Sequence, residues 1–117
     1  MQKRHRIVRG QDFQRVMSGS RVHAGHGLVA FARPRVEGPT RVGVTSSRRV
    51  KGAVARNRAR RRLREVARLH LLGGDSPLRG TGIAYDVVLI ARPEALALPF
   101  AALAAEVIAF RKRLESG

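Results

Sequence analysis

The stretch from Arg48 to Arg68 constrains the fold of this chain most, because it combines dense positive charge with helical spacing. It holds ten Lys and Arg residues and a single acid, Glu65. At 100° per residue, the apolar positions and one histidine share an arc of about 80°; they are Ala55, Ala59, Leu63, Val66 and His70. The pattern predicts a helix over about residues 53–72 that buries one face, and not a disordered basic tail.

The other faces of this predicted helix carry arginines. One flank has a stripe of four and the other has two: Arg56, Arg60, Arg64 and Arg68, then Arg58 and Arg62. Guanidinium groups at this density repel one another unless a polyanion lies beside them, and their forked donors match phosphate oxygens. The whole chain has 24 Lys and Arg against 8 Asp and Glu, a formal net charge of +16. We therefore expect a nucleic acid as the partner.

The composition excludes several other classes of protein. No apolar run approaches the roughly 20 residues that span a bilayer, and the N-terminus lacks the apolar stretch of a signal peptide, so we expect a cytoplasmic protein. The chain has no cysteine, which excludes disulfides and Cys-type zinc sites. At 117 residues and 44% hydrophobic, it is expected to form one domain over 1–117 around one core.

Two further helices and three strands are expected around the arginine helix. A short helix after Gly10 has an apolar face made of Phe13, Val16 and Met17. Strands are expected at 28–32, 41–46 and 85–91, the first two as a hairpin and the last as a central strand covered on both faces. A final helix begins after Pro99. The order α-β-β-α-β-α predicts an α+β sandwich, in which about three helices pack on a mixed β-sheet.

Three blocks of the sequence resemble the protein subunit of bacterial ribonuclease P. The main block is continuous and reads RVGVTSSRRV at 41–50, AVARNR at 53–58 and RRLRE at 61–65. The other two read DFQRV at 12–16 and DVVLIARP at 86–93, and they lie in the order that the family has. The resemblance covers about residues 1–93.

This resemblance implies a function in RNA processing. Proteins of the family bind a large catalytic RNA and assist endonucleolytic removal of the 5′ leader from precursor tRNA, while that RNA performs the hydrolysis with bound Mg²⁺. The protein would then supply no catalytic residue, no metal site and no organic cofactor, and would need no protein oligomer. The resemblance also implies a left-handed crossover through the arginine helix, against the usual hand.

The resemblance and the arginine stripe together give two sets of candidate residues. The RNA-binding set is Arg48, Arg49, Lys51, Arg56, Asn57, Arg58, Arg60, Arg61, Arg62, Arg64 and Arg68. The set expected to line a cleft for the single-stranded leader is Phe13, Val16, Met17 and Phe31. Two features depart from the family pattern: Met17 stands where an aromatic is common, and Val50-Lys51-Gly52 replaces the order Val-Gly-Lys.

Plainer alternatives stay open for several of these residues. Phe13 and Phe31 are equally suited to filling a core between the first helix and the sheet, and Asn57 is suited to a helix N-cap. We interpret His23 and His26 as a solvated loop pair and Asp86 as structural. For the whole chain, the alternatives are a structural RNA-binding protein of ribosomal type and a DNA-binding regulator; the regulator would need a second helix one tight turn away.

Overall fold

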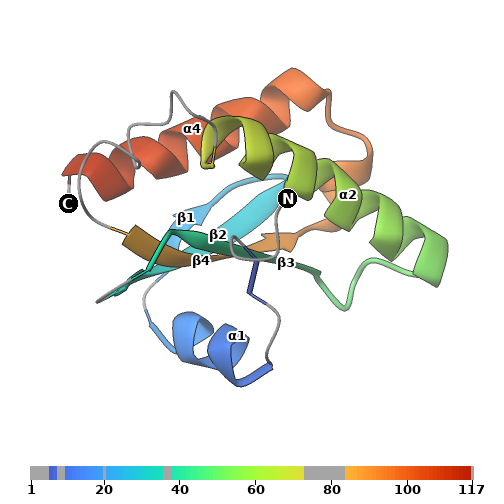
Figure 1. The fold of residues 1–117 in the computed structure, drawn as a ribbon. Helices are drawn as coiled ribbons and strands as arrows, with labels where there is room; N and C mark the ends of the chain where they lie inside the picture. Colours follow the sequence, from blue (N-terminus) through green and yellow to red (C-terminus); the bar gives the residue numbers. More distant parts are fainter. Residues whose placement is uncertain (1–5, 8–9, 20, 36–37, 73–83, 117) are drawn as a thin grey trace.

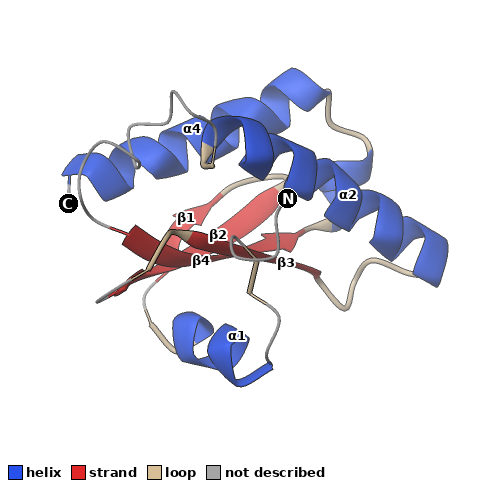
Figure 2. Cartoon of the chain, in the orientation of Figure 1, coloured by secondary structure: helices blue, strands red, loops and turns tan. Residues whose placement is uncertain are grey.

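A four-stranded sheet lies between two layers of helices (Figure 1). The computed structural model describes residues 6–7, 10–19, 21–35, 38–72 and 84–116. Helices α2 (Ala53–His70) and α4 (Phe100–Ser116) cover one face of the sheet, and the short helix α1 (Gly10–Met17) covers the other (Figure 2). We call these the α2 face and the α1 face. The expected α+β class is confirmed: in the described parts of the chain, three α-helices pack on a mixed sheet.

The strands do not follow the order of the sequence. They are β1 (Arg21–Ala24), β2 (Leu28–Arg35), β3 (Arg41–Ser46) and β4 (Ala84–Ala91), arranged β1-β2-β4-β3. Strand β4 pairs antiparallel with β2 and parallel with β3, so it separates them. The expected hairpin between 28–32 and 41–46 is therefore wrong. The crossover through α2 joins the parallel strands β3 and β4. The left-handed sense of this crossover stays a prediction.

The central position of β4 follows from its side chains, which are apolar on both faces. Val87, Leu89 and Ala91 point into the main core on the α2 face, and all three are fully buried. Val88 and Ile90 alternate with them and belong to a smaller cluster on the α1 face. A strand with this pattern exposes the least apolar surface to water when both of its faces are covered and both of its edges are paired. The expected central strand is confirmed.

The predicted face of α2 is the face that packs on the sheet. Ala59, Leu63 and Val66 are 0% exposed, as is Ala67 beside them. Ala55 and His70 at the two ends of the arc are only partly buried. The last helix contributes Leu103, Val107 and Phe110 to the same core. Phe110 is the largest fully buried side chain.

Strand β1 and the 3-10 helix η2 (Pro93–Leu96) were not expected from the sequence. His23 lies on β1 at 9% exposure, and its Nε2 is 2.9 Å from Oε1 of Glu106 on α4. The other Glu106 oxygen accepts the Gly27 N–H at 2.9 Å, which fastens the β1–β2 hairpin to α4. The interpretation of His23 as a solvated loop residue is therefore wrong, whereas His26 is exposed.

Glycine is needed in this hairpin because the carboxylate of Glu106 occupies the space of a side chain. A Cβ on Gly25 would lie 1.8 Å from Glu106 Oε1 and 2.6 Å from His23 Nε2. Any side chain there would displace Glu106 from both of its partners. The attachment of the β1–β2 hairpin to α4 thus depends on a glycine and an acid that lie far apart in the sequence.

Candidate RNA interface

The turn before α2 presents three basic side chains on a fixed backbone. Val50 is buried and its N–H donates to Ser47 O at 3.0 Å, while Ser47 Oγ accepts the Arg49 N–H at 3.1 Å. Gly52 ends the turn at φ +89°, a conformation that favours glycine. The departure from the family order thus places a glycine where the backbone requires one. The exposed basic residues of the turn are Arg48, Arg49 and Lys51.

The α2 arginines differ in how far they reach solvent. The exposed ones are Arg58, Arg61, Arg64 and Arg68, whereas Arg56 and Arg60 are half-buried. Arg60 donates to the Oδ1 of Asn57, which is itself exposed. Asn57 is not the helix N-cap, because α2 begins at Ala53 and Gly52 holds that position. We call Arg48, Arg49, Lys51, Arg58, Arg61 and Arg64 the basic surface.

Besides Arg60, two further arginines of the tract, Arg62 and Arg68, have protein partners. Arg62 donates through Nη2 to Leu98 O at 2.6 Å and through Nη1 to Ala95 O, so it ties α2 to η2 and the loop after it. Arg68 lies 2.5 Å from Glu65 Oε1, and this hydrogen bond lowers the pKa of Glu65 and raises the pKa of Arg68. Arg62 therefore presents fewer free donors to solvent than the residues of the basic surface.

The predicted cleft residues come together on the α1 face. Val16 is 1% exposed and packs with Ile7 and Val88, so it supports this region from beneath. The half-buried residues around it form what we call the apolar patch: Phe13, Met17, Phe31 and Ile90. The partial exposure of Phe13 and Phe31 fits neither a pure core role nor a fully open cleft. Each ring packs on the small core and is also in contact with solvent.

Phe13 lies against the backbone of β3. A Cβ on Gly43 would come 2.6 Å from both Cε1 and Cζ of the Phe13 ring. Gly43 thus leaves room for the ring, and α1 approaches the sheet more closely than it could over a larger residue. This contact fixes the Phe13 end of the apolar patch.

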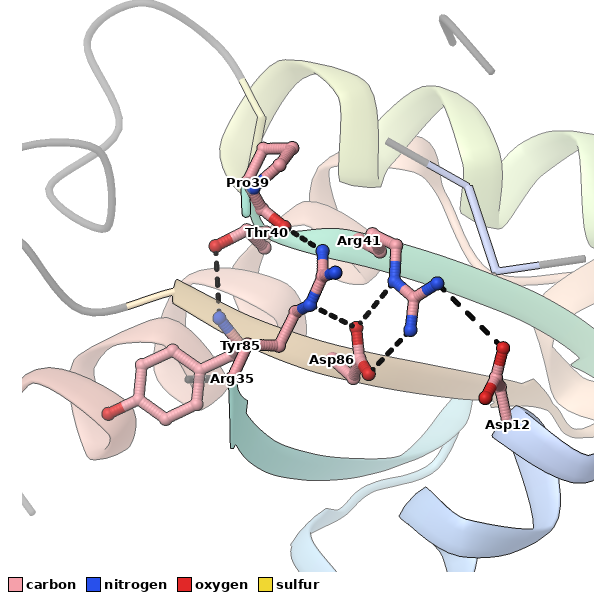
Figure 3. Close-up of polar contacts among 7 residues, drawn as sticks. All are labelled: Asp12, Arg35, Pro39, Thr40, Arg41, Tyr85 and Asp86. Carbon is pink, nitrogen blue, oxygen red and sulfur yellow. Dashed lines mark hydrogen bonds and ion pairs between the residues drawn. The ribbon is translucent and has the colours of Figure 1, made fainter. Parts of the chain in front are cut away.

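A polar network closes one end of the α1 face (Figure 3). Arg41 donates from Nε and Nη2 to the two oxygens of Asp86, both at 2.8 Å, and Arg35 Nε lies 3.5 Å from Asp86 Oδ1. Arg41 Nη1 also lies 3.8 Å from Asp12 Oδ2 on α1. The hydrogen bonds to Asp86, with a smaller contribution from Asp12, raise the pKa of the Arg41 guanidinium. The structural interpretation of Asp86 is confirmed.

One basic residue near the basic surface was missed by sequence reasoning. Arg92 directly follows β4, where the Ser47 N–H donates to Ala91 O at 2.8 Å, so Arg92 lies next to the turn that carries Arg48 and Arg49. The Arg92 N–H in turn donates to Gly27 O at 2.9 Å. Its place in the block at 86–93 was the available signal.

Other kinds of site find little support in the described part of the chain. There, no group of three or more His, Asp or Glu side chains is arranged to hold a metal ion. No described helix is both long enough and apolar enough to span a bilayer. What the described residues do offer is a basic surface on one side of the sheet and an apolar patch on the other, an arrangement suited to RNA phosphates and to unstacked bases.

Comparison with known proteins identifies the family. The family model described as Ribonuclease P matches residues 1–115. The ribonuclease P protein component of Chloroflexus aurantiacus is 37% identical over 114 residues, covering 97% of this chain and 79% of that protein. That of Gluconacetobacter diazotrophicus is 38% identical over 104 residues, covering 88% and 84%.

Solved structures agree with these matches. The RNase P protein of Staphylococcus aureus superposes with a TM-score of 0.68 at 25% identity, covering 94% of each chain. The RNase P protein of Thermotoga maritima gives a TM-score of 0.71 at 22% identity over 94% of this chain and 97% of that one, which supports the fold. With a family match over almost its whole length and relatives above 30% identity, this chain belongs to the ribonuclease P protein component family.

Proposed function

We propose that this ribonuclease P protein component uses two surfaces for two RNAs. The basic surface binds the catalytic RNA subunit, and the apolar patch binds the single-stranded 5′ leader of precursor tRNA. The observation that carries this division is the position of the two surfaces on opposite faces of one sheet, since α2 covers one face and α1 the other (Figure 1). One protein is then able to touch both RNAs at once.

The charge of the basic surface supports contact with a large folded RNA. Its six residues are exposed, and among the described residues none of them has an acidic partner. Phosphate binding would relieve their mutual repulsion and release counterions from the RNA. We assign Arg62 to the packing of α2 on η2 instead, because its terminal nitrogens already donate to Ala95 and Leu98.

The apolar patch supports contact with bases. Stacking a base on an aromatic ring contributes roughly 1–3 kcal/mol and tolerates any sequence, which suits leaders that differ from one tRNA to another. Phe13 and Phe31 supply rings, and Met17 supplies a thioether that packs on a base less specifically. The family match and the relatives support this function over the alternative of a structural RNA-binding protein of ribosomal type.

We assign hydrolysis, and the Mg²⁺ that it requires, to the RNA subunit. Among the described residues, no group of three or more His, Asp or Glu side chains is arranged to hold a metal ion, which supports this assignment. Protein freed of all RNA should therefore leave precursor tRNA intact in Mg²⁺, whereas the same preparation mixed with the catalytic RNA should raise the rate of leader removal. Cleavage by the RNA-free protein would contradict this assignment.

The basic surface can be tested through salt dependence. Replacing Arg58, Arg61 and Arg64 with alanine should lower the slope of log affinity for the catalytic RNA against log salt by roughly 0.7–0.9 for each phosphate that the protein no longer neutralises. The fold should survive, because all three side chains are exposed.

Arg62→Ala is the matched control for the single variant Arg61→Ala, since each removes one positive charge from the same helix. It should leave the slope nearly unchanged but lower the free energy of unfolding by about 1–3 kcal/mol, because two carbonyls lose their donor. A slope that falls as much for Arg62→Ala as for Arg61→Ala would show that the described geometry does not select the RNA contacts.

The apolar patch can be tested by comparing precursor and mature tRNA. Phe13→Ala or Phe31→Ala should weaken holoenzyme binding of precursor tRNA by roughly 1–3 kcal/mol and hardly affect mature tRNA, which lacks the leader. Leu63→Ala on the α2 face is the control for general destabilisation, and it should cost about 2–5 kcal/mol of unfolding free energy without changing the preference for precursor. Equal losses for both tRNAs in the Phe variants, with a large drop in melting temperature, would make the rings core residues only.

A further inference from the structure

Helix α1 is held to the sheet by few contacts of its own. Val16 is its one fully buried residue, and Phe13 and Met17 are half-buried. A helix of eight residues with so small a buried face is free to shift or rotate unless something else fixes it. The position of the Phe13 ring, and so the shape of the apolar patch, depends on that fixation.

Two consecutive residues of β3 provide it. Val42 O accepts the Ile7 N–H at 3.1 Å, which anchors the segment before α1. The preceding residue, Arg41, reaches over to Asp12 in the first turn of α1, with 3.8 Å between Nη1 and Oδ2. Arg41 is itself immobilised by its two hydrogen bonds to Asp86, as Figure 3 shows. Strand β3 thus contacts the chain both at Ile7, before α1, and at Asp12, in the first turn of α1.

The acid at position 12 needs an explanation in this protein. The chain carries 8 acids against 24 basic residues, and a carboxylate next to a surface that binds RNA repels phosphate. Asp12 directly precedes Phe13, whose ring lies against Gly43, two residues along β3 from Arg41. The ion pair and the ring contact therefore act on neighbouring points of the same helix and the same strand. The side chains of Asp12 and Arg41 are 16% and 23% exposed, so water still reaches this ion pair.

We propose that Asp12 is a positioning residue for leader recognition: through Arg41 it fixes α1 over β3 and so holds Phe13 in place for the leader. This inference rests on the proposed role of the apolar patch. Asp12 touches no RNA in this proposal, and its contribution to binding is positive although its charge is unfavourable. Removing the charge of Asp12 would raise RNA affinity if the carboxylate only repels phosphate. It would lower the affinity for the leader if the carboxylate positions Phe13.

The test compares Asp12→Asn with Asp12→Glu and Glu94→Gln in the reconstituted holoenzyme. Glu94 is exposed on η2, so its variant raises the net charge by one, as Asp12→Asn does, without touching α1. The ratio of precursor to mature tRNA affinity should fall about two- to fivefold in Asp12→Asn, as expected for a partly exposed ion pair. It should stay unchanged in Glu94→Gln and in Asp12→Glu, which keeps the carboxylate.

Hydrogen exchange gives a readout that is independent of RNA. In Asp12→Asn the amides of 10–17 should exchange faster while those of 53–70 stay as protected as in the wild type. A precursor preference that is retained or increased in Asp12→Asn, or one that falls equally in Glu94→Gln, would overturn the role of Asp12.

Phe13→Ala separates this inference from the function on which it rests. If Phe13→Ala loses the preference for precursor and Asp12→Asn keeps it, the role of Asp12 alone is overturned. If Phe13→Ala keeps the preference, the apolar patch does not bind the leader, and the role of Asp12 falls with it.

Discussion

The central strand β4 has apolar side chains on both of its faces, and both faces of the sheet must therefore be covered by other elements. Val87 and Leu89 require a cover on one side, and Val88 and Ile90 require one on the other. The α2 face is sealed by two long helices, whereas the α1 face has a helix of only eight residues. The short cover leaves Phe31 and Ile90 half-exposed, so the apolar patch results from incomplete burial of the same strand that organises the main core.

The long helix α2 on the other face carries both the buried side chains that pack on the sheet and the exposed arginines to which we assign RNA binding. Its buried arc, centred on Leu63, packs on the sheet. The arginines therefore lie on the flanks and on the solvent-facing side of the helix. Arg62 donates to backbone carbonyls of η2 and of the loop after it, while Arg58 and Arg61 are exposed to solvent. Glu65 pairs with Arg68 and offsets little of the local charge. The free protein therefore keeps a self-repelling surface that an RNA would stabilise.

Sequence periodicity predicted what is local. The limits of β3 at Arg41 and Ser46, the start of α2 at Ala53 and the central place of β4 all follow from short-range patterns, and the structure confirms them. The supposed hairpin was wrong because β4, some forty residues further on, competes for both strands and buries more apolar surface in the middle. Strand β1 has only four residues and no clear alternation, and it depends on a contact between His23 and Glu106 that no local pattern contains.

The candidate site divides in the same way. The basic tract is visible in the sequence because charge density is a local property. The separate role of Arg62 was not visible, since its acceptors lie on η2 and the loop after it, and η2 was not expected. The link between Asp12 and Arg41 likewise depends on how α1 returns over β3, which only the tertiary structure specifies.

Site-specific photo-crosslinking would test the division of the two RNAs between two faces most directly. One variant would carry a photoreactive side chain in place of Arg61, on α2, and another in place of Phe31, on β2. In the holoenzyme with precursor tRNA, the first should crosslink to the catalytic RNA and the second to the 5′ leader. Crosslinks from position 61 to the leader, or from position 31 only to the catalytic RNA, would contradict this division.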